Sequence, residues 1–307
     1  MSEKSWGEHS GNILAEKEGI HTIDCELCGF AHVVPLPDEA EKADFYENAF
    51  YDSEKEDYIA KHQEDEAWWR VEHNEKLDQL EALLPDTEQP NRILDIGSGP
   101  GLFLKVAKER GWDAEGIEPG LSAWRYSTEN LGLTVHRAYV DGSNAQRFGQ
   151  FDVVHLNNVL EHVVHAGDFV SHIHRMVKSS GFVSISVPND FNPLQAVAAK
   201  QLEHEPWWVV PLHHINYFNR SSLEALLRQH GFETCYTTGS FPLELFLLMG
   251  VDYISDGGKG SGVHQQRKLF ELTMEKHGQT ALKRKMYDAL ASVGVGRLVT
   301  VIAQKKE

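Results

Sequence analysis

Short apolar runs alternate with helix-favouring stretches from residue 91 onwards. This alternation is typical of βαβ units, in which a helix joins two parallel strands of one sheet. The pattern therefore predicts an α/β fold with a seven-stranded sheet. The predicted strands are 92–96, 113–118, 134–140, 151–156, 181–187, 232–237 and 297–303, and the helices between them are 102–110, 122–131, 166–178 and 221–230.

Several stretches do not follow this alternation. Residues 1–20 are polar and contain glycine, which predicts a loose tail, and residues 38–84 are acidic with apolar positions at helical spacing. Residues 190–217 are too long for a simple connection, and 241–293 form a second insertion. The predicted organisation is an N-terminal part, 1–85, with a tail, a possible zinc element and a helical lid, followed by a main domain, 86–307. The two insertions come before and after its sixth strand.

Charge and hydropathy exclude some classes of partner. The chain has 29 Lys and Arg against 46 Asp and Glu, a formal net charge of −17, which argues against a surface that neutralises nucleic-acid phosphates. No apolar run approaches the roughly 18 residues of a membrane-spanning helix. The first residues lack the apolar stretch of a secretory signal. We therefore expect a cytoplasmic protein whose partner is neither a nucleic acid nor a membrane.

The segment 93–104 has the pattern of a strand, a glycine turn and the start of a helix. Gly97, Gly99 and Gly101 permit a tight turn and let a ligand approach the backbone closely. Seventeen residues after the last of these glycines, the next predicted strand ends at Glu118, whose carboxylate can accept hydrogen bonds from both hydroxyls of a ribose. A ligand that contains a nucleoside is therefore expected at the carboxyl edge of the sheet.

The spacing of the glycines separates two classes of nucleotide ligand. A dinucleotide fingerprint, G-x-G-x-x-G, requires glycine at the position of Leu102. Asp95 precedes the first glycine by two positions, where it can hold the turn and reach a positively charged amino group but would repel a pyrophosphate. A nucleotide-dependent oxidoreductase is therefore the less favoured alternative.

The glycine motif belongs to a recognisable pattern. The sequence D-I-G-S-G-P-G at 95–101, followed by G-I-E-P at 116–119, resembles the first two motifs of class I S-adenosylmethionine-dependent methyltransferases. The stretches 151–163, 180–189 and 214–232 resemble later segments of the branch related to quinone biosynthesis and small-molecule methylation. The resemblance implies a Rossmann-like, mostly parallel sheet with helices on both faces, closed by one antiparallel strand, which suits 297–303.

The same resemblance implies a site for the methyl donor S-adenosylmethionine at the carboxyl ends of the strands. The residues implied are Asp95, Gly97, Gly99 and Gly101 for the methionine part, Glu118 for the ribose, Asp141 for the adenine and Asn157 beside the sulfonium.

The acceptor is not identified by these motifs. The donor methyl group is already activated, so the protein has to align an acceptor lone pair in line behind it and exclude water. An acceptor hydroxyl also needs a base, and the candidates are His162, His213 and His214. The tryptophan pairs 68–69 and 207–208 either stack on an acceptor ring or belong to the core. We expect methyl transfer to a small molecule, either a sugar or nucleotide sugar or an aromatic compound. A catalytically silent donor-binding scaffold is the alternative.

A second cluster of chemical interest lies near the N-terminus. His21, Cys25, Cys28 and His32 are residue types that bind zinc tetrahedrally. Four ligands within twelve residues is a tight spacing, so a remote His or Asp is an alternative to one of the two histidines. The cysteines can also form a redox pair or remain small side chains without a ligand. Structural zinc is the favoured interpretation. A catalytic metal is not expected, because a methyl donor needs no Lewis acid and the sequence shows no ligand set with an open position.

Overall fold

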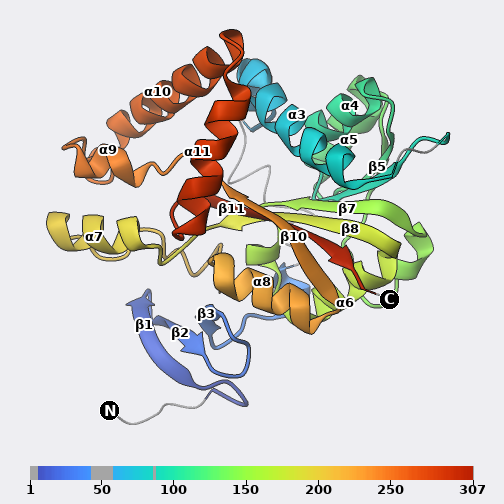
Figure 1. The fold of residues 1–307 in the computed structure, drawn as a ribbon. Coiled ribbons are helices and arrows are strands. Elements are labelled where there is room, and N and C mark those ends of the chain that lie inside the picture. Colours follow the sequence, from blue (N-terminus) through green and yellow to red (C-terminus); the bar gives the residue numbers. More distant parts are fainter. Residues whose placement is uncertain (1–5, 43–57, 86–87, 307) are drawn as a thin grey trace.

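The computed structural model describes residues 6–42, 58–85 and 88–306 (Figure 1). Its centre is a seven-stranded sheet in the order β10-β11-β8-β7-β4-β5-β6. Only β11 runs antiparallel to its neighbours, β8 and β10, among the pairs of this sheet. The predicted α/β fold with seven mostly parallel strands is confirmed. The strands are β4 (Arg92–Ile96), β5 (Asp113–Ile117), β6 (Thr134–His136), β7 (Phe151–Asn157), β8 (Val177–Pro188), β10 (Phe232–Gly239) and β11 (Leu298–Lys305).

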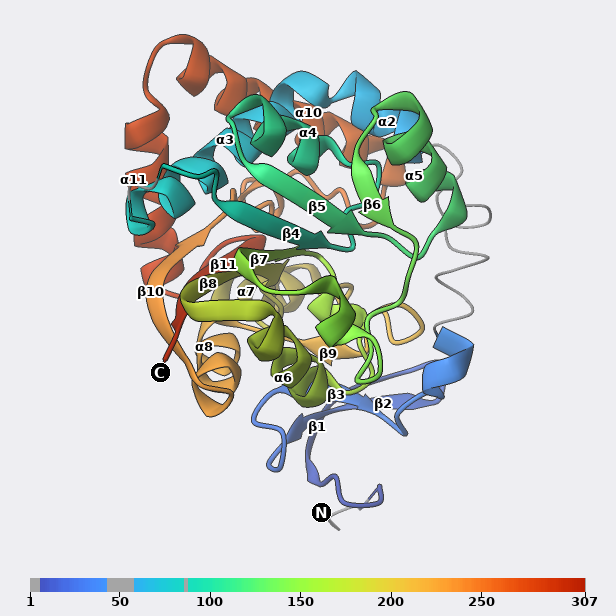
Figure 2. The same cartoon turned by 90° about the vertical axis from the view of Figure 1, so that its right-hand side faces the viewer.

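Helices cover both faces of this sheet, as Figures 1 and 2 show. On one face lie α3 (Glu66–Leu83), α4 (Leu102–Glu109), α5 (Leu121–Arg125) and α11 (Thr280–Ser292), and on the other lie α6 (Ala166–Met176) and α8 (Arg220–Gln229). Successive residues of β4 enter different cores: Ile93 packs with Leu77 and Leu80 of α3, whereas Leu94 packs with Ile173 of α6. A strand that is buried on both faces carries apolar side chains at successive positions, as at Ile93 and Leu94, where a strand with one exposed face would alternate apolar and polar residues.

The N-terminal residues form a second, antiparallel sheet in the order β1-β2-β3-β9. Its strands are β1 (Gly11–Lys17), β2 (Ile20–Cys25), β3 (Ala31–Val34) and β9 (Asn216–Tyr217), the last contributed by the first insertion. Figure 1 shows this sheet, in blue, on the side of α6 and α8. The prediction of a loose tail over 1–20 is wrong for residues 11–20. The strand β1 is mostly exposed, so its polar sequence is that of a solvent-facing edge strand.

The predicted helices before the main domain are present as α2 (Tyr58–Glu64) and α3, while residues 43–57 of that stretch lie outside the described residues. The first insertion contains α7 (Pro193–Leu202), and the second contains α9 (Glu244–Leu248), α10 (Gly257–Lys276) and α11. Helix α10 begins within the glycine-rich segment, because the side chain of Asp256 accepts a hydrogen bond from the backbone N–H of Gly258 at 3.1 Å.

Buried ion pairs join the N-terminal helices to the second insertion. Arg267 of α10 contacts Glu72 of α3 at 2.7 Å, and Lys283 of α11 contacts Glu75 at 3.1 Å. Because removing one partner of a buried pair leaves an uncompensated charge, these contacts fix α3 against α10 and α11. Two segments that are far apart in sequence thus form one layer over the same part of the sheet.

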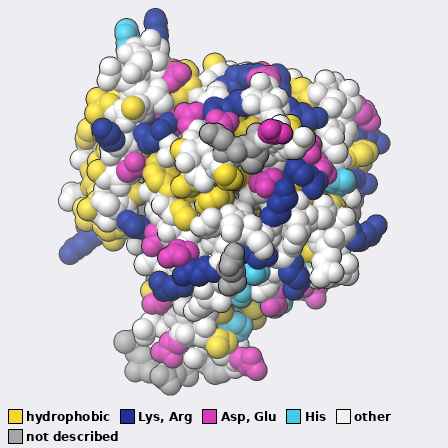
Figure 3. All heavy atoms as spheres, turned by 45° about the vertical axis from the view of Figure 1, so that its right-hand side comes forward, with side chains coloured by type: hydrophobic (Ala, Val, Ile, Leu, Met, Phe, Trp, Pro, Cys, Tyr) yellow, Lys and Arg dark blue, Asp and Glu magenta, His cyan; other side chains and the backbone are white. Residues whose placement is uncertain are grey.

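The described residues include no helix that is both long and apolar enough to cross a membrane. On the face drawn in Figure 3, Lys and Arg side chains lie among Asp and Glu side chains. This mixture differs from the continuous basic stripe that follows a nucleic-acid backbone.

Candidate functional site

The glycine turn connects β4 to α4 and needs glycine for two reasons. Gly97, Gly99 and Gly101 have φ angles of 72°, 52° and 87°, in the left-handed region that favours glycine. A Cβ atom at Gly97 would lie 2.5 Å from Cγ2 of Val159. Gly101 is the N-cap of α4, and a Cβ atom there would lie 2.6 Å from Cδ1 of Leu133. Gly97 and Gly99 also line the cavity described below, whereas Gly101 does not and packs only against the fold.

The carboxylate of Glu118 holds this turn from the end of β5. Its Oε2 accepts a hydrogen bond from the backbone N–H of Gly99, and its Oε1 accepts one from Gly120, both at 2.8 Å. A carboxylate can accept several hydrogen bonds at once, and the predicted contacts with two ribose hydroxyls would add to these two.

Asp95 supplies a second buried acid beside Glu118. Burial raises the pKa of Asp95 well above its usual range, the positive charge of Lys76 opposes that shift, and the negative charge of Glu118 adds to it. Two neighbouring buried carboxyl groups favour a cationic ligand over an anionic one, since a ligand cation stabilises their ionised forms. This chemistry fits S-adenosylmethionine, with its sulfonium and ammonium groups, better than a dinucleotide.

These residues line a cavity of about 660 Å³, a size typical of small-molecule sites. Three parts of the chain contribute to its walls: the N-terminal helices, the carboxyl ends of the strands, and the insertions. The aromatic part of the lining includes Tyr58, His62, Trp68, Trp69, Phe103 and His155, and the polar part includes Asp95, Glu118, Asn157, Glu161, His162, His213 and His214.

Two of the residues implied for the donor site lie in different surroundings. Asn157 ends β7, lines the cavity, and accepts a hydrogen bond on Oδ1 from Nζ of Lys76 at 2.9 Å. Asp141 is exposed, and its Oδ1 accepts hydrogen bonds from Ser143 and Asn144 within its own loop. The structure therefore brings Asn157 to the site but turns Asp141 into its loop. Tyr139 and Val140 line the cavity in its place.

The three candidate bases all line the cavity, next to an acid that the sequence analysis did not single out. Nδ1 of His162 donates to the carbonyl oxygen of His213 at 2.9 Å, and its Nε2 lies 3.7 Å from Oε1 of Glu161. The ring of His214 lies edge-on to that of His162, with 5.0 Å between centroids. Burial raises the pKa of Glu161 to about 8.

One potential ligand atom from each of Glu161, His162 and His214 lies within 4.8 Å of the others. From the sequence we expected no set of metal ligands with an open coordination position, and that expectation overlooked these three residues. The sequence could have pointed to them, because Glu161 and His162 are adjacent and follow the fourth predicted strand, 151–156, by only a few residues.

The two tryptophan pairs have different surroundings. Trp68 and Trp69 line the cavity, and the ring of Trp69 is stacked on that of His62 with 4.8 Å between centroids. Trp207 and Trp208 pack instead in a hydrophobic cluster with Val209, so the core interpretation applies to them. Of the two pairs, only 68–69 is placed to contact a ligand in the cavity.

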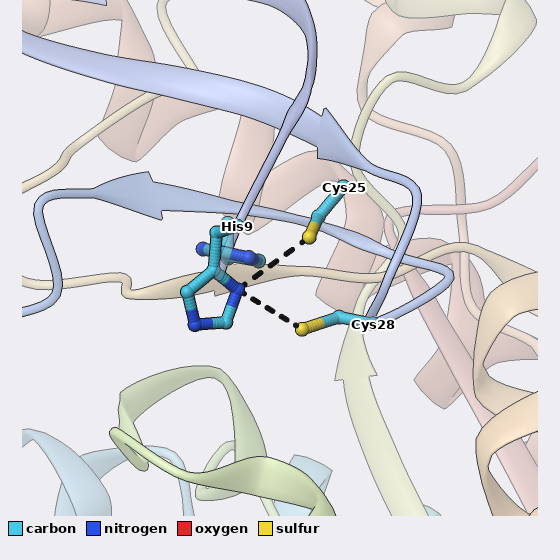
Figure 4. Close-up of side chains that lie close together, drawn as sticks. His9, Cys25 and Cys28 are labelled. Atoms are coloured by element: carbon cyan, nitrogen blue, oxygen red, sulfur yellow. Dashed lines mark hydrogen bonds between the residues drawn. The ribbon is translucent and has the colours of Figure 1, made fainter. Parts of the chain in front are cut away.

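The N-terminal part brings together a second group of potential metal ligands, and Figure 4 shows three of them, His9, Cys25 and Cys28. One ligand atom from each of His9, Cys25, Cys28 and His32 lies within 4.8 Å of the others. Nδ1 of His9 lies 3.6 Å from Sγ of Cys25 and 3.5 Å from Sγ of Cys28. Nδ1 of His32 donates to the carbonyl oxygen of Val33 at 2.8 Å, while its buried Nε2 has no hydrogen-bond partner. Two thiols and two imidazoles in this arrangement fit a tetrahedral zinc ion.

His9 takes the place that the spacing assigned to His21. Both His21 and Cys25 belong to β2, and four residues along a strand span about 13 Å, too far for one metal ion. Nδ1 of His21 contacts Glu16 at 3.4 Å instead. The alternative of a remote histidine is the one that the structure supports.

Comparison with known proteins matches a family model described as a methyltransferase domain over residues 68–237, more than half of the chain. A ubiquinone biosynthesis O-methyltransferase of Pseudomonas aeruginosa is 34% identical over 103 residues, which cover 32% of this chain and 44% of the relative. One of Roseobacter denitrificans is 29% identical over 155 residues, covering 48% of this chain and 62% of the relative. The chain thus spans about half the length of these curated relatives.

Solved structures share the fold at low sequence identity. A 1,6-didemethyltoxoflavin-N1-methyltransferase of Burkholderia thailandensis, solved with S-adenosylhomocysteine, has a TM-score of 0.52 and 15% identity, and the match covers 95% of this chain and all of that one. The plantazolicin methyltransferase BpumL, also solved with S-adenosylhomocysteine, has a TM-score of 0.51 and 14% identity, with 88% and 96% covered. The chain therefore belongs to the methyltransferase-domain family, among the class I methyltransferases that use S-adenosylmethionine as co-substrate.

Proposed function

We propose that the protein transfers the methyl group of S-adenosylmethionine to a hydroxyl oxygen of a small molecule by in-line displacement. The observation that carries this proposal is a single cavity lined both by the donor-side acids Asp95 and Glu118 and by His162, His213 and His214. Groups held in one cavity of this size react with the advantage of proximity. The curated relatives, which are O-methyltransferases, support an oxygen acceptor.

On the donor side, each residue has a role that follows from its charge and position. Asp95 binds the ammonium group, Glu118 binds the ribose hydroxyls, and Gly97 and Gly99 let the methionine part approach the backbone. Asn157 lies beside the sulfur, and Lys76 fixes its amide through the hydrogen bond to Oδ1. S-adenosylmethionine supplies a methyl group on a positively charged sulfur.

On the acceptor side, the aromatic lining offers flat apolar area to a ring. Trp68, Trp69 and Phe103 suit an aromatic compound or the face of a sugar, and the ring of a nucleotide sugar presents the same kind of face. One of His162, His213 and His214 accepts the proton of the acceptor hydroxyl as the base. Apart from Phe103, these groups come from segments outside the glycine motif, so the acceptor is selected largely separately from the donor.

In the N-terminal sheet, we propose a structural zinc ion bound by His9, Cys25, Cys28 and His32. The unpartnered Nε2 of His32, in a side chain that is 1% exposed, supports this assignment. A buried polar atom without a partner is unfavourable, and a metal ion is a partner that also suits the two thiols.

The test combines donor binding with a search for the acceptor. Isothermal titration should show S-adenosylhomocysteine binding. Incubation with S-adenosylmethionine and a panel of phenols, catechols and nucleotide sugars should release S-adenosylhomocysteine, detected by mass spectrometry, with at least one of them. The Glu118→Ala variant is the control for background hydrolysis. A protein that binds the donor product but methylates no acceptor, in the panel or in a cell extract, would be the donor-binding scaffold and would overturn the proposal.

A further inference from the structure

Two arginines line the cavity, and their surroundings differ. Arg267 is buried, and its guanidinium contacts Glu72 at 2.7 Å and Glu271 at 3.2 Å. The side chain of Arg297 is 36% exposed, and its Nη1 lies 4.0 Å from Oδ1 of Asp190, beyond hydrogen-bond distance. Within the described part of the chain, the guanidinium of Arg297 makes no hydrogen bond. Arg297 therefore brings to the cavity a positive charge and five N–H donors that the protein itself does not use.

The backbone holds Arg297 at the carboxyl edge of the sheet. This residue immediately precedes β11, whose first residue, Leu298, pairs with Pro188 at the end of β8. Both members of that pair also line the cavity. The N–H of Asn189 donates to the carbonyl oxygen of Arg297 at 3.1 Å, and Nδ2 of Asn189 donates to that of Gly296 at 3.1 Å. Because the backbone on which the guanidinium is carried is fixed, less ordering is needed when a ligand binds to it.

Asp190 does not neutralise Arg297 in the way that Glu72 neutralises Arg267. Asp190 is buried, and its Oδ1 accepts a hydrogen bond from Nε2 of Gln195 at 3.3 Å. Burial raises the pKa of Asp190 to about 6, although the charge of Arg297 opposes that shift. At 4.0 Å this carboxyl group attracts the guanidinium without using its N–H donors. Those donors stay available to an oxyanion of a ligand.

The charges of the cavity differ between its two sides. Asp95 of β4 and Glu118 after β5 make the donor side acidic. Strands β7 and β8 lie between β4 and β11 in the sheet, so Arg297 is roughly 14 Å away from β4 at the usual strand spacing. The acidic side attracts the ammonium group of the donor and repels an anion, whereas the guanidinium attracts an anion. An anionic group on the acceptor is thus directed away from the donor-side acids.

We propose that Arg297 binds an oxyanion of the acceptor, a carboxylate or a phosphate, and so selects acceptors that carry a negative charge as well as a hydroxyl group. The proposal rests on the proposed function and narrows its acceptor class. A guanidinium presents two parallel N–H groups to a carboxylate or phosphate, so it determines the direction of the acceptor as well as its charge. A hydroxybenzoate and a nucleotide sugar meet this requirement, whereas a catechol and a free sugar do not.

Pairs of compounds that differ in the anionic group test this assignment. One pair is 3,4-dihydroxybenzoate and its neutral amide, and the other is glucose 1-phosphate and methyl glucoside. Each compound is titrated calorimetrically into the protein saturated with S-adenosylhomocysteine. We expect the anionic member of at least one pair to bind at least about tenfold more tightly than its neutral partner. The pair that shows the difference tells whether the oxyanion is a carboxylate or a phosphate.

Variants of Arg297 connect this preference to the guanidinium. Arg297→Gln should weaken binding of the anionic compound roughly 10- to 100-fold and leave binding of its neutral partner unchanged. Arg297→Lys keeps the charge but loses the paired N–H groups, so its affinity should lie between those of the wild type and Arg297→Gln. The matched control is Arg220→Gln. Arg220 is 38% exposed, contacts Glu224 at 2.9 Å and does not line the cavity, so this variant should bind like the wild type.

A purely structural role of Arg297 gives a different result, because it would weaken both members of a pair equally. Equal weakening in Arg297→Gln overturns the proposal. Equal affinity within both pairs in the wild type, or no binding of any of the four compounds, overturns it as well. Affinity for S-adenosylhomocysteine and the thermal midpoint show that each variant is folded. These outcomes leave the proposed function intact, whereas a wild-type protein that does not bind S-adenosylhomocysteine would overturn the proposed function itself.

Discussion

Replacement of Glu118 by alanine separates the two roles that the structure gives to this carboxylate. The side chain accepts hydrogen bonds from the N–H groups of Gly99 and Gly120, both at 2.8 Å, and the proposal adds the ribose hydroxyls of the donor. Hydrogen bonds to a charged group contribute about 1.5 to 3 kcal/mol each. Loss of one such bond to the ribose corresponds to a roughly 10- to 100-fold increase in the Kd for the donor. The two backbone bonds are also lost, so the turn should become less stable in the free protein.

The matched control for this variant is Glu115→Ala. Glu115 lies on the same strand, but it contacts Arg92 at 2.7 Å and His136 at 3.0 Å and does not line the cavity. Isothermal titration with S-adenosylhomocysteine should therefore give weaker binding for Glu118→Ala and unchanged binding for Glu115→Ala. Thermal unfolding reports how much each variant is destabilised. If Glu118→Ala is folded and binds the donor product as tightly as the wild type, the ribose assignment is refuted.

Three further predictions concern the turn, the second acid and the zinc site. Gly97→Val places a β-branched side chain at a φ of 72° and against Val159. It should therefore destabilise the protein by about 1 to 3 kcal/mol, which is measured as a lower thermal midpoint. An unchanged midpoint would contradict the strain argument. Burial raises the pKa of Asp95, whereas a bound ammonium group favours its ionised form, so donor affinity should rise with pH and binding should release a proton. Calorimetry in buffers of different ionisation enthalpy measures that proton, and proton uptake would exclude the contact. Cys25→Ser should remove about one equivalent of zinc and lower stability without abolishing donor binding; metal-free wild-type protein of undiminished stability would leave the cysteines without this role.

The main sheet and the donor site could be predicted because their physical causes are local. The strand β4 is buried on both faces, so its apolar run is visible in the sequence itself. Positive φ angles at Gly97 and Gly99 leave glycine as the fitting residue, so the turn also has a local signature. Glu118 follows at the end of the next strand, where parallel strands bring their carboxyl ends to one edge. Lys76 is different: its contact with Asn157 depends on how α3 packs over the sheet, and no spacing in the sequence records that packing.

The N-terminal sheet could not be predicted for a related reason. The strand β1 is exposed along most of its length, so hydrophobic periodicity does not mark it as a strand. Its register with β2 places Gly11 opposite Cys25, and this pairing carries His9 to the two thiols. Spacing along one strand suggested His21, although a zinc site is assembled across strands. A correct ligand set required the strand pairing, which is a property of the folded chain.

The position of the N-terminal sheet links the proposed zinc ion to the acceptor side of the cavity. The hydrophobic cluster beside the cysteines, around Ile23, Cys25 and Val34, is small, so a bound metal ion would add stability to this part of the sheet. The strand β3 pairs with β9, and the N–H of Val33 donates to the carbonyl oxygen of Ile215 at 2.9 Å. The N–H of Ile215 in turn donates to the carbonyl oxygen of Glu161, so a continuous set of backbone hydrogen bonds runs from the sheet with the proposed zinc site to a residue that lines the cavity. Loss of the zinc ion should therefore loosen the acceptor side before the donor side, because the glycine turn and Glu118 are bonded to β5 and not to this sheet.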